Sequence, residues 1–92
     1  MKLYLDTSKR EEKILRVGKK EYKTSGSIFG LIVEKVKDPK NIEWVDFNEG
    51  PGDSFTGLKV GASIANAINY ALGKIGPSEV KLPNYGKEPN IG

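Results

Sequence analysis

The 92-residue sequence contains no cysteine and no histidine. Without cysteine the chain has no disulfide and no thiolate metal site. Without histidine it has no imidazole base, and the Ser-His-Asp and Cys-His forms of nucleophilic catalysis are excluded. Carboxylates, hydroxyls and backbone amides are the groups left for chemistry, so few enzyme classes are open to this chain.

Long apolar runs are also missing. No segment reaches the roughly 18 apolar residues needed to span a bilayer, and the first residues alternate where a signal peptide is uniformly apolar. We therefore expect a cytoplasmic protein with no membrane partner. A chain of this length is expected to form one domain that buries only about 60–65% of its unfolded surface, so that a partner would add stability.

Charge is present but unevenly distributed. The net charge is +3, and residues 1–24 hold eight basic and four acidic side chains whereas the rest hold seven and eight. Such a basic segment is typical of nucleic-acid contact, and equally of solvated strands with lysine at a sheet edge. The candidate nucleic-acid contacts are Lys13, Arg16, Lys19, Lys20 and Lys23.

Apolar periodicity and turn residues predict seven elements along the chain. They are strands at 2–6, 13–17 and 20–24, a helix at 28–37, a strand at 42–47, a helix at 56–74 and a strand at 79–82. The first three strands form an antiparallel meander, and helices and strands alternate after it. This order predicts an α/β fold, a single lobe of ribonuclease-H-like type over residues 1–82, with 83–92 as an extended tail.

Both predicted helices carry more apolar or small surface than one sheet covers. The arc of the first is about 200° wide, which exceeds the stripe of a surface helix. The second has a glycine-containing apolar stripe and a separate flank of small and amide side chains. We predict that these surfaces contact a partner. The alternatives are a first helix that lies deep in the core and a flank of the second helix that is plain solvent surface. The candidate interface residues are Ile28, Phe29, Leu31, Ile32, Leu58, Ala62, Ala65, Asn66 and Asn69.

Residues 50–61 (GPGDSFTGLKVG) join the strand at 42–47 to the second helix. Exposed amides at a helix N-terminus, together with hydroxyls, bind anions. The alternative is a turn in which Ser54 or Thr56 caps the helix. The segment is not a Walker motif, because no lysine follows in the required place. The candidate anion-binding residues are Gly50, Gly52, Ser54, Thr56 and Gly57.

Three acidic residues near strand ends are candidates for metal-dependent chemistry. Asp6 ends the first strand, and Asp46 and Glu49 follow in the later strand and loop. Two-metal catalysis needs several carboxylates around ions roughly 4 Å apart. The alternative is an ordinary turn at residues 6–8. We predict no catalytic residue, no metal site and no cofactor for the chain.

Residues 3–8 (LYLDTS) and residues 50–61 resemble the TsaB-type (YeaZ) family of the ASKHA superfamily, relatives of the glycoprotease-like TsaD proteins. The family pattern GPGSFTG, a basic residue, one position and a glycine is continued here by Lys59 and Gly61. The resemblance covers residues 1 to about 75. It departs from the family by an inserted Asp53, a shorter connection around the first helix and the lack of a second lobe.

The resemblance implies a role in tRNA threonylcarbamoyladenosine biosynthesis. Family members perform no chemistry, and they bind a TsaD-like catalytic subunit through a bundle made by the two helices. It therefore implies a non-catalytic subunit that touches tRNA only indirectly, or a homodimer through the same helices. The alternative is a one-lobe phosphotransferase or metal-dependent nuclease that uses Asp6 and residues 50–57. A basic accessory protein that binds tRNA directly is the third hypothesis.

Overall fold

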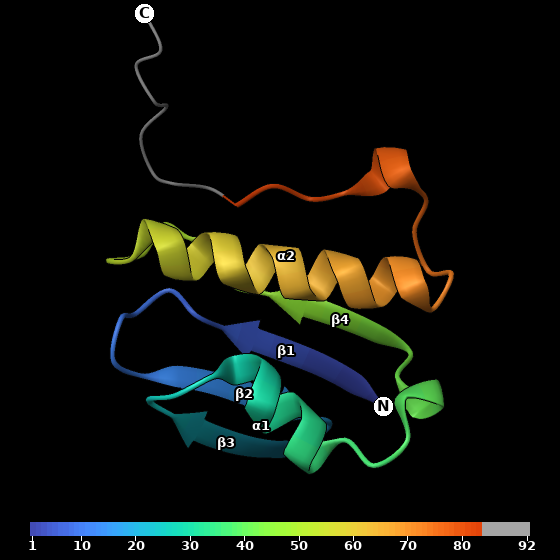
Figure 1. Cartoon of the computed structure of the whole chain (residues 1–92), viewed down its shortest axis with the longest axis horizontal. Helices are drawn as coiled ribbons and strands as arrows, with labels where there is room; N and C mark the ends of the chain where they lie inside the picture. The colour runs from blue at the N-terminus through green and yellow to red at the C-terminus, as the bar shows by residue number, and fades with distance from the viewer. Residues whose placement is uncertain (84–92) are drawn as a thin grey trace, which may run out of the picture.

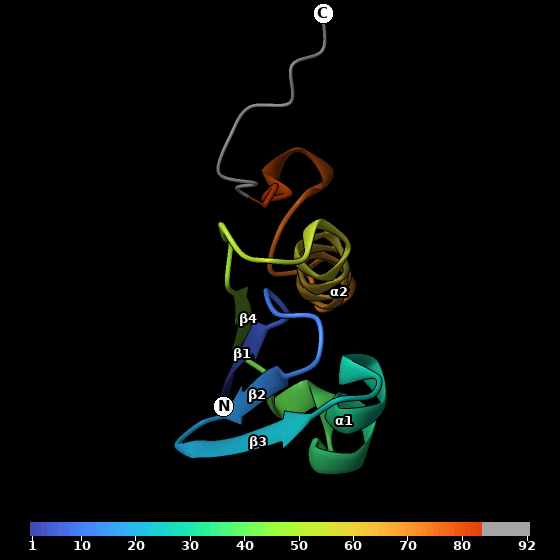
Figure 2. The same cartoon turned by 90° about the vertical axis from the view of Figure 1, so that its left-hand side faces the viewer.

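The computed structural model describes residues 1–83. Within them one four-stranded sheet carries two α-helices on a single face, which gives two layers (Figures 1 and 2). The strands are β1 (Lys2–Asp6), β2 (Lys13–Val17), β3 (Lys20–Thr24) and β4 (Trp44–Phe47). The helices are α1 (Ile28–Lys35) and α2 (Phe55–Ala71), and two 3-10 turns lie at Pro39–Asn41 and Pro77–Glu79.

The sheet is mixed and has the strand order β3-β2-β1-β4. β1, β2 and β3 pair antiparallel, and β4 pairs parallel with β1. The connection from β3 to β4 passes over the sheet through α1, because parallel strands need a crossover. Both β3 and β4 are therefore edge strands.

The core lies between the sheet and the helices. Alternation along the strands buries Leu3, Leu5 and Leu15 on the helix-bearing face. α1 packs above β2, whereas α2 lies above β1 and β4. Ala62 and Ala65 of α2 are buried, and their short side chains let the helix approach the sheet closely.

Local capping explains where the helices begin. Ser27 precedes α1, and its side chain accepts a hydrogen bond from the Gly30 amide at 3.1 Å. Ser54 precedes α2, and its side chain accepts a hydrogen bond from the Gly57 amide at 2.9 Å. The first three strands have the predicted bounds, and both helices exist but end earlier than predicted, at residues 35 and 71. No helix of residues 1–83 has the length and apolar character needed to cross a membrane.

The prediction of a ribonuclease-H-like (ASKHA) lobe is wrong. The described residues form four strands and two α-helices, with three of the strands in the first 24 residues, which is too little for a full lobe of that type. The predicted strand at 79–82 is absent, and a 3-10 turn leads there into a segment that pairs with no strand. The physical reason is that side chains of α2 occupy the backbone groups that would have paired. The predicted tail falls mostly on residues 84–92, outside the described part.

Candidate functional site

The glycines of residues 50–61 allow α2 to contact the loop that follows β1. A Cβ atom on Gly57 would meet the carbonyl oxygen of Thr7, and one on Gly61 would meet its hydroxyl. Thr7 is buried and donates a hydrogen bond from Oγ1 to the Gly57 carbonyl at 2.6 Å. A Cβ on Gly52 would in the same way overlap Ser8. The glycine segment therefore holds two parts of this chain together.

Several amides of the predicted anion-binding loop donate within the chain. The Gly57 amide donates to the Ser54 side chain, and the Ser54 amide to the Ser8 carbonyl at 3.1 Å. The Gly50 amide donates to Asn48 Oδ1 at 2.9 Å. These three amides are not available to a ligand. Of the two predicted caps, Ser54 is the one used, and Thr56 is exposed on α2.

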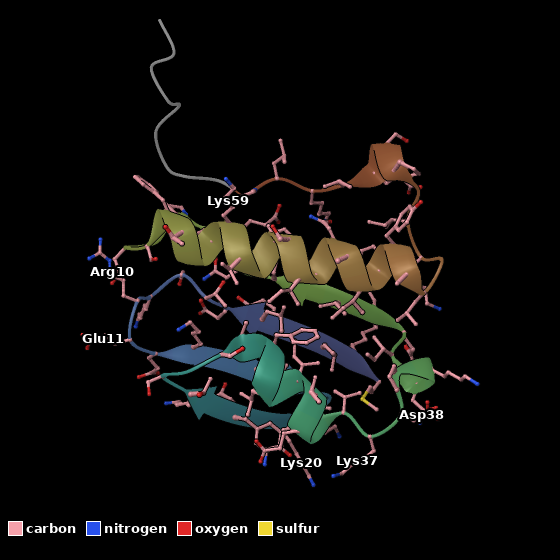
Figure 3. All side chains as sticks on the ribbon, viewed as in Figure 1. Arg10, Glu11, Lys20, Lys37, Asp38 and Lys59 are labelled. Atoms are coloured by element: carbon pink, nitrogen blue, oxygen red, sulfur yellow. The ribbon has the colours of Figure 1, made fainter. Side chains whose placement is uncertain are left out.

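Asp53 joins the two loops at this end of the sheet. Its Oδ1 accepts a hydrogen bond from the Arg10 amide at 3.2 Å. Arg10 and Glu11 lie in the loop between β1 and β2, at the same end as the start of α2 (Figure 3). Asp53 therefore has a structural contact within the chain.

Asp6 organises the turn after β1. Its Oδ1 accepts from the Ser8 amide at 3.1 Å, the Ser8 hydroxyl at 2.6 Å and Asn48 Nδ2 at 3.2 Å. Partial burial alone would raise the pKa of Asp6. The hydrogen bonds from Ser8 and Asn48, with the charge of Lys9, outweigh burial and hold that pKa below its ordinary value of 3.8.

The candidate acids are not brought together. Asp46 points to the sheet face without helices, where it accepts a hydrogen bond from Trp44 Nε1 at 2.8 Å. Among residues 1–83, no group of three or more Asp or Glu side chains is placed to hold a metal ion. The geometry of Asp6 is that of a turn-forming residue, and Glu49 is exposed in the next loop.

Four predicted interface residues of α2 belong to the core of this chain. They are Leu58, Ala62, Ala65 and Asn69, all of them exposed by 4% or less. They face the sheet and cannot contact a partner in this fold. On α1, Ile28 and Ile32 are likewise buried, Leu31 is half-buried and Phe29 is 55% exposed. Of the predicted interface, Phe29 is therefore the large exposed side chain.

Two asparagines of α2 each bind a backbone segment through both ends of the amide. Asn69 donates to the Val45 carbonyl and accepts from the Val45 amide, both at 2.9 Å. Asn66 donates to the Lys81 carbonyl at 2.7 Å and accepts from the Lys81 amide at 3.1 Å. Asn69 thereby occupies groups on the free edge of β4, and Asn66 holds the following segment beside the helix.

The exposed apolar residues of α1 lie on the side that faces α2. Lys35 places its Nζ 4.7 Å from the centre of the Tyr22 ring on β3, so that side of α1 faces the sheet edge. At 100° per residue, Phe29 and Val33 lie on the opposite side of the buried row. Val33 is 63% exposed. Both side chains therefore point toward the space between the helices.

The facing side of α2 is also apolar. Gly57 and Gly61 contact Thr7 on this side of the helix, and Ile64 and Ile68 share it and are half-buried. Figure 1 shows the two helices separated above the sheet, with β1 visible between them. We name Phe29, Val33, Ile64 and Ile68 the interhelix surface. The wide apolar arc of the first helix is the sequence signal for the interhelix surface. On α2, the flank that the sequence predicts as the interface is buried in the core instead.

The sheet face without helices has its own arrangement of side chains. The Arg16 guanidinium lies 5.2 Å from the centre of the Tyr4 ring, and its Nε lies 3.0 Å from Glu21 Oε1. Burial, followed by the Asp6 charge, raises the pKa of Tyr4 although Arg16 opposes this. Arg16 and Glu21 therefore form an ion pair on this face, which the sequence patterns do not indicate.

Neither the family models nor the curated proteins contain a match to this chain.

Proposed function

We propose that this chain is a cytoplasmic, non-catalytic subunit that pairs with a TsaD-like catalytic protein in tRNA threonylcarbamoyladenosine modification. The observation that carries the proposal is the interhelix surface, which combines exposed apolar side chains of α1 with half-buried ones of α2. The identity of the partner rests on the resemblance of residues 3–8 and 50–61 to TsaB-type proteins.

A binding role is favoured over a catalytic one by how the candidate chemical groups are used. Asp6 accepts three hydrogen bonds in its own turn, and Ser54 caps α2. The glycines contact Thr7 and Ser8. Each of these groups therefore has a structural task within the chain, whereas Phe29 and Val33 are apolar, exposed and take no part in these hydrogen bonds.

The size of the interhelix surface sets the expected contribution to binding. Complete burial of a Phe or Val side chain contributes about 1.5–3 kcal/mol. Phe29 and Val33 are 55% and 63% exposed, so a partner that buries the remainder gains about 1 kcal/mol or more from each. Two such residues change the dissociation constant by roughly 30-fold or more, because 1.4 kcal/mol is a factor of ten.

The test is a calorimetric titration of this chain with the TsaD-like protein of the same source. We expect binding, and we expect Phe29→Gln combined with Val33→Glu to weaken it at least tenfold. Leu82→Gln is the matched control, since Leu82 is 77% exposed but lies beside the other flank of α2. Circular dichroism checks that all variants keep their helices.

The proposal fails if the two proteins do not associate, or if the control weakens binding as much as the double variant. Sedimentation of this chain alone decides the homodimer alternative. A dimer that Phe29→Gln with Val33→Glu dissociates, in the absence of any binding to the TsaD-like protein, would assign the interhelix surface to self-association and overturn the proposed pairing.

A further inference from the structure

Three segments distant in sequence meet at the start of β1 and bring lysines together. The Gly18 amide donates to the Lys2 carbonyl at 3.0 Å, and the Glu43 amide to the Met1 carbonyl at 2.8 Å. The Met1 amino group donates to the Asn41 carbonyl at 2.7 Å. We name residues 2, 18–20 and 34–43 the lysine end.

The chain after α1 reaches the same end because α1 runs back along β3. Lys35, in the last turn of α1, lies over Tyr22 in the middle of that strand, and the chain after α1 continues past it. Figure 3 shows Lys20 and Lys37 at this end of the molecule, whereas Lys59 lies beyond α2 on the opposite side. The tertiary structure therefore adds Lys37 and Lys40 to the lysines of the first strands.

The net charge of the described chain is concentrated here. The lysine end carries six lysines and three acidic residues, while the rest of residues 1–83 carries eight basic and eight acidic side chains. One of the six, Lys35, lies 3.4 Å from Glu34. The other five are exposed, and within residues 1–83 none of them has a carboxylate within 4.0 Å. They are Lys2, Lys19, Lys20, Lys37 and Lys40.

The five basic residues that the sequence predicts as nucleic-acid contacts are not all unpaired and exposed. Arg16 pairs with Glu21, and Lys23 lies 3.6 Å from Glu12. Lys13 is half-buried. Of that predicted set, Lys19 and Lys20 are both exposed and without a carboxylate within 4.0 Å among residues 1–83, and they belong to the lysine end.

We propose that the lysine end binds RNA directly, through the phosphate backbone and without reading sequence. Unpaired lysines held together repel one another, and a polyanion relieves that repulsion with release of its counterions. The exposed large apolar side chains of residues 1–83 all lie outside the lysine end. An anionic membrane surface is therefore the less suitable partner, since no side chain here enters the acyl region.

The number of lysines predicts the salt dependence. Five phosphate contacts give a slope of log K against log salt of about −3.5 for single-stranded and about −4.5 for double-stranded nucleic acid. Raising the salt from about 50 to about 200 mM then weakens binding roughly 100- to 500-fold. A surface with one or two contacts gives a much smaller change.

The test measures fluorescence anisotropy of a labelled RNA stem–loop of about 20 nucleotides against the full chain. We expect Lys20→Gln with Lys37→Gln to weaken binding at least tenfold and to reduce the slope by about 1.5. Lys59→Gln with Lys81→Gln removes the same charge from exposed residues elsewhere and is expected to change both values little.

Absence of RNA binding at about 50 mM salt overturns the proposal, and so does an equal loss in both double variants. A pelleting assay with phosphatidylserine vesicles is the second arm. Vesicle binding that depends on Lys20 and Lys37, without RNA binding, assigns the lysine end to a membrane instead. The proposal is independent of the pairing through the interhelix surface, which the partner titration tests with other residues.

Discussion

Asn69→Leu is the substitution that best tests how the edge of this sheet is held. Leucine has nearly the shape of asparagine but cannot hydrogen-bond, so both Val45 backbone groups lose their partner. Asn69 is 2% exposed, and the bonds are buried. An unsatisfied buried donor or acceptor costs about 1–3 kcal/mol, which gives about 4 kcal/mol for the two groups. Burial of the leucine offsets roughly 1 kcal/mol of this loss.

The expected decrease in unfolding free energy is therefore about 3 kcal/mol. For a domain of this size, that corresponds to a fall in Tm of about 12–24 °C. Urea unfolding followed by the fluorescence of Trp44 measures the free energy directly. Asn66→Leu is the matched control on the same helix, since its bonds to Lys81 are exposed and water replaces them at a cost of about 1 kcal/mol. Equal losses in the two variants would refute the reasoning, as would a loss below about 1 kcal/mol at Asn69.

Two further predictions concern the glycines and Asp6. Gly61→Ala is expected to destabilise the fold by at least 2 kcal/mol, because the added Cβ overlaps Thr7. Gly30→Ala in α1 is the control: its Cβ meets only ordinary contacts, and the higher helix propensity of alanine stabilises the fold by about 1 kcal/mol. Thermal unfolding compares the two variants, and equal effects would contradict the close contact at Gly61. Asp6 stabilises the fold above its unfolded pKa near 3.8, and this contribution is lost as the pH falls through the lower folded pKa. Unfolding free energies measured from about pH 5 to pH 2 should therefore fall more steeply in the natural chain than in Asp6→Asn, and parallel curves would contradict this.

The local elements of this chain follow from its sequence. Alternating apolar residues and the turn at Gly18 define the three antiparallel strands, and Gly18 has the positive φ of 60° that this turn needs. Ser27 and Ser54 mark both helix starts. These features depend on neighbouring residues, and short-range rules describe them well.

The face of α2 that enters the core was predicted incorrectly, for a reason that lies in the edge strand. Small and amide side chains on one flank of a helix are typical of solvent surface or of a close helix contact, so the sequence places the flank with Asn66 and Asn69 outside the core. The backbone of β4 needs a donor and an acceptor on its free side, and a buried amide supplies both. This requirement becomes visible only once β4 is known to lie at the sheet edge. Because Asn69 already occupies the Val45 amide and carbonyl, residues 79–82 do not pair there as a further strand.

The lysine end could not be predicted from charge counts along the chain. The basic first 24 residues suggested a contact surface, but pairing with Glu12 and Glu21 removes two of its members. Lys37 and Lys40 join only because α1 returns along β3. Which charges stay unpaired is a property of the tertiary contacts.

The amide that closes the edge of β4 also affects how copies of this chain behave toward one another. An open strand edge is a template on which another chain extends the sheet, and this is how many aggregates begin. Here Asn69 occupies the Val45 groups from within the molecule, and Lys20 and Lys23 place charge on β3, the other edge. Loss of the single amide would therefore expose a site for sheet-to-sheet growth before the rest of the fold opens.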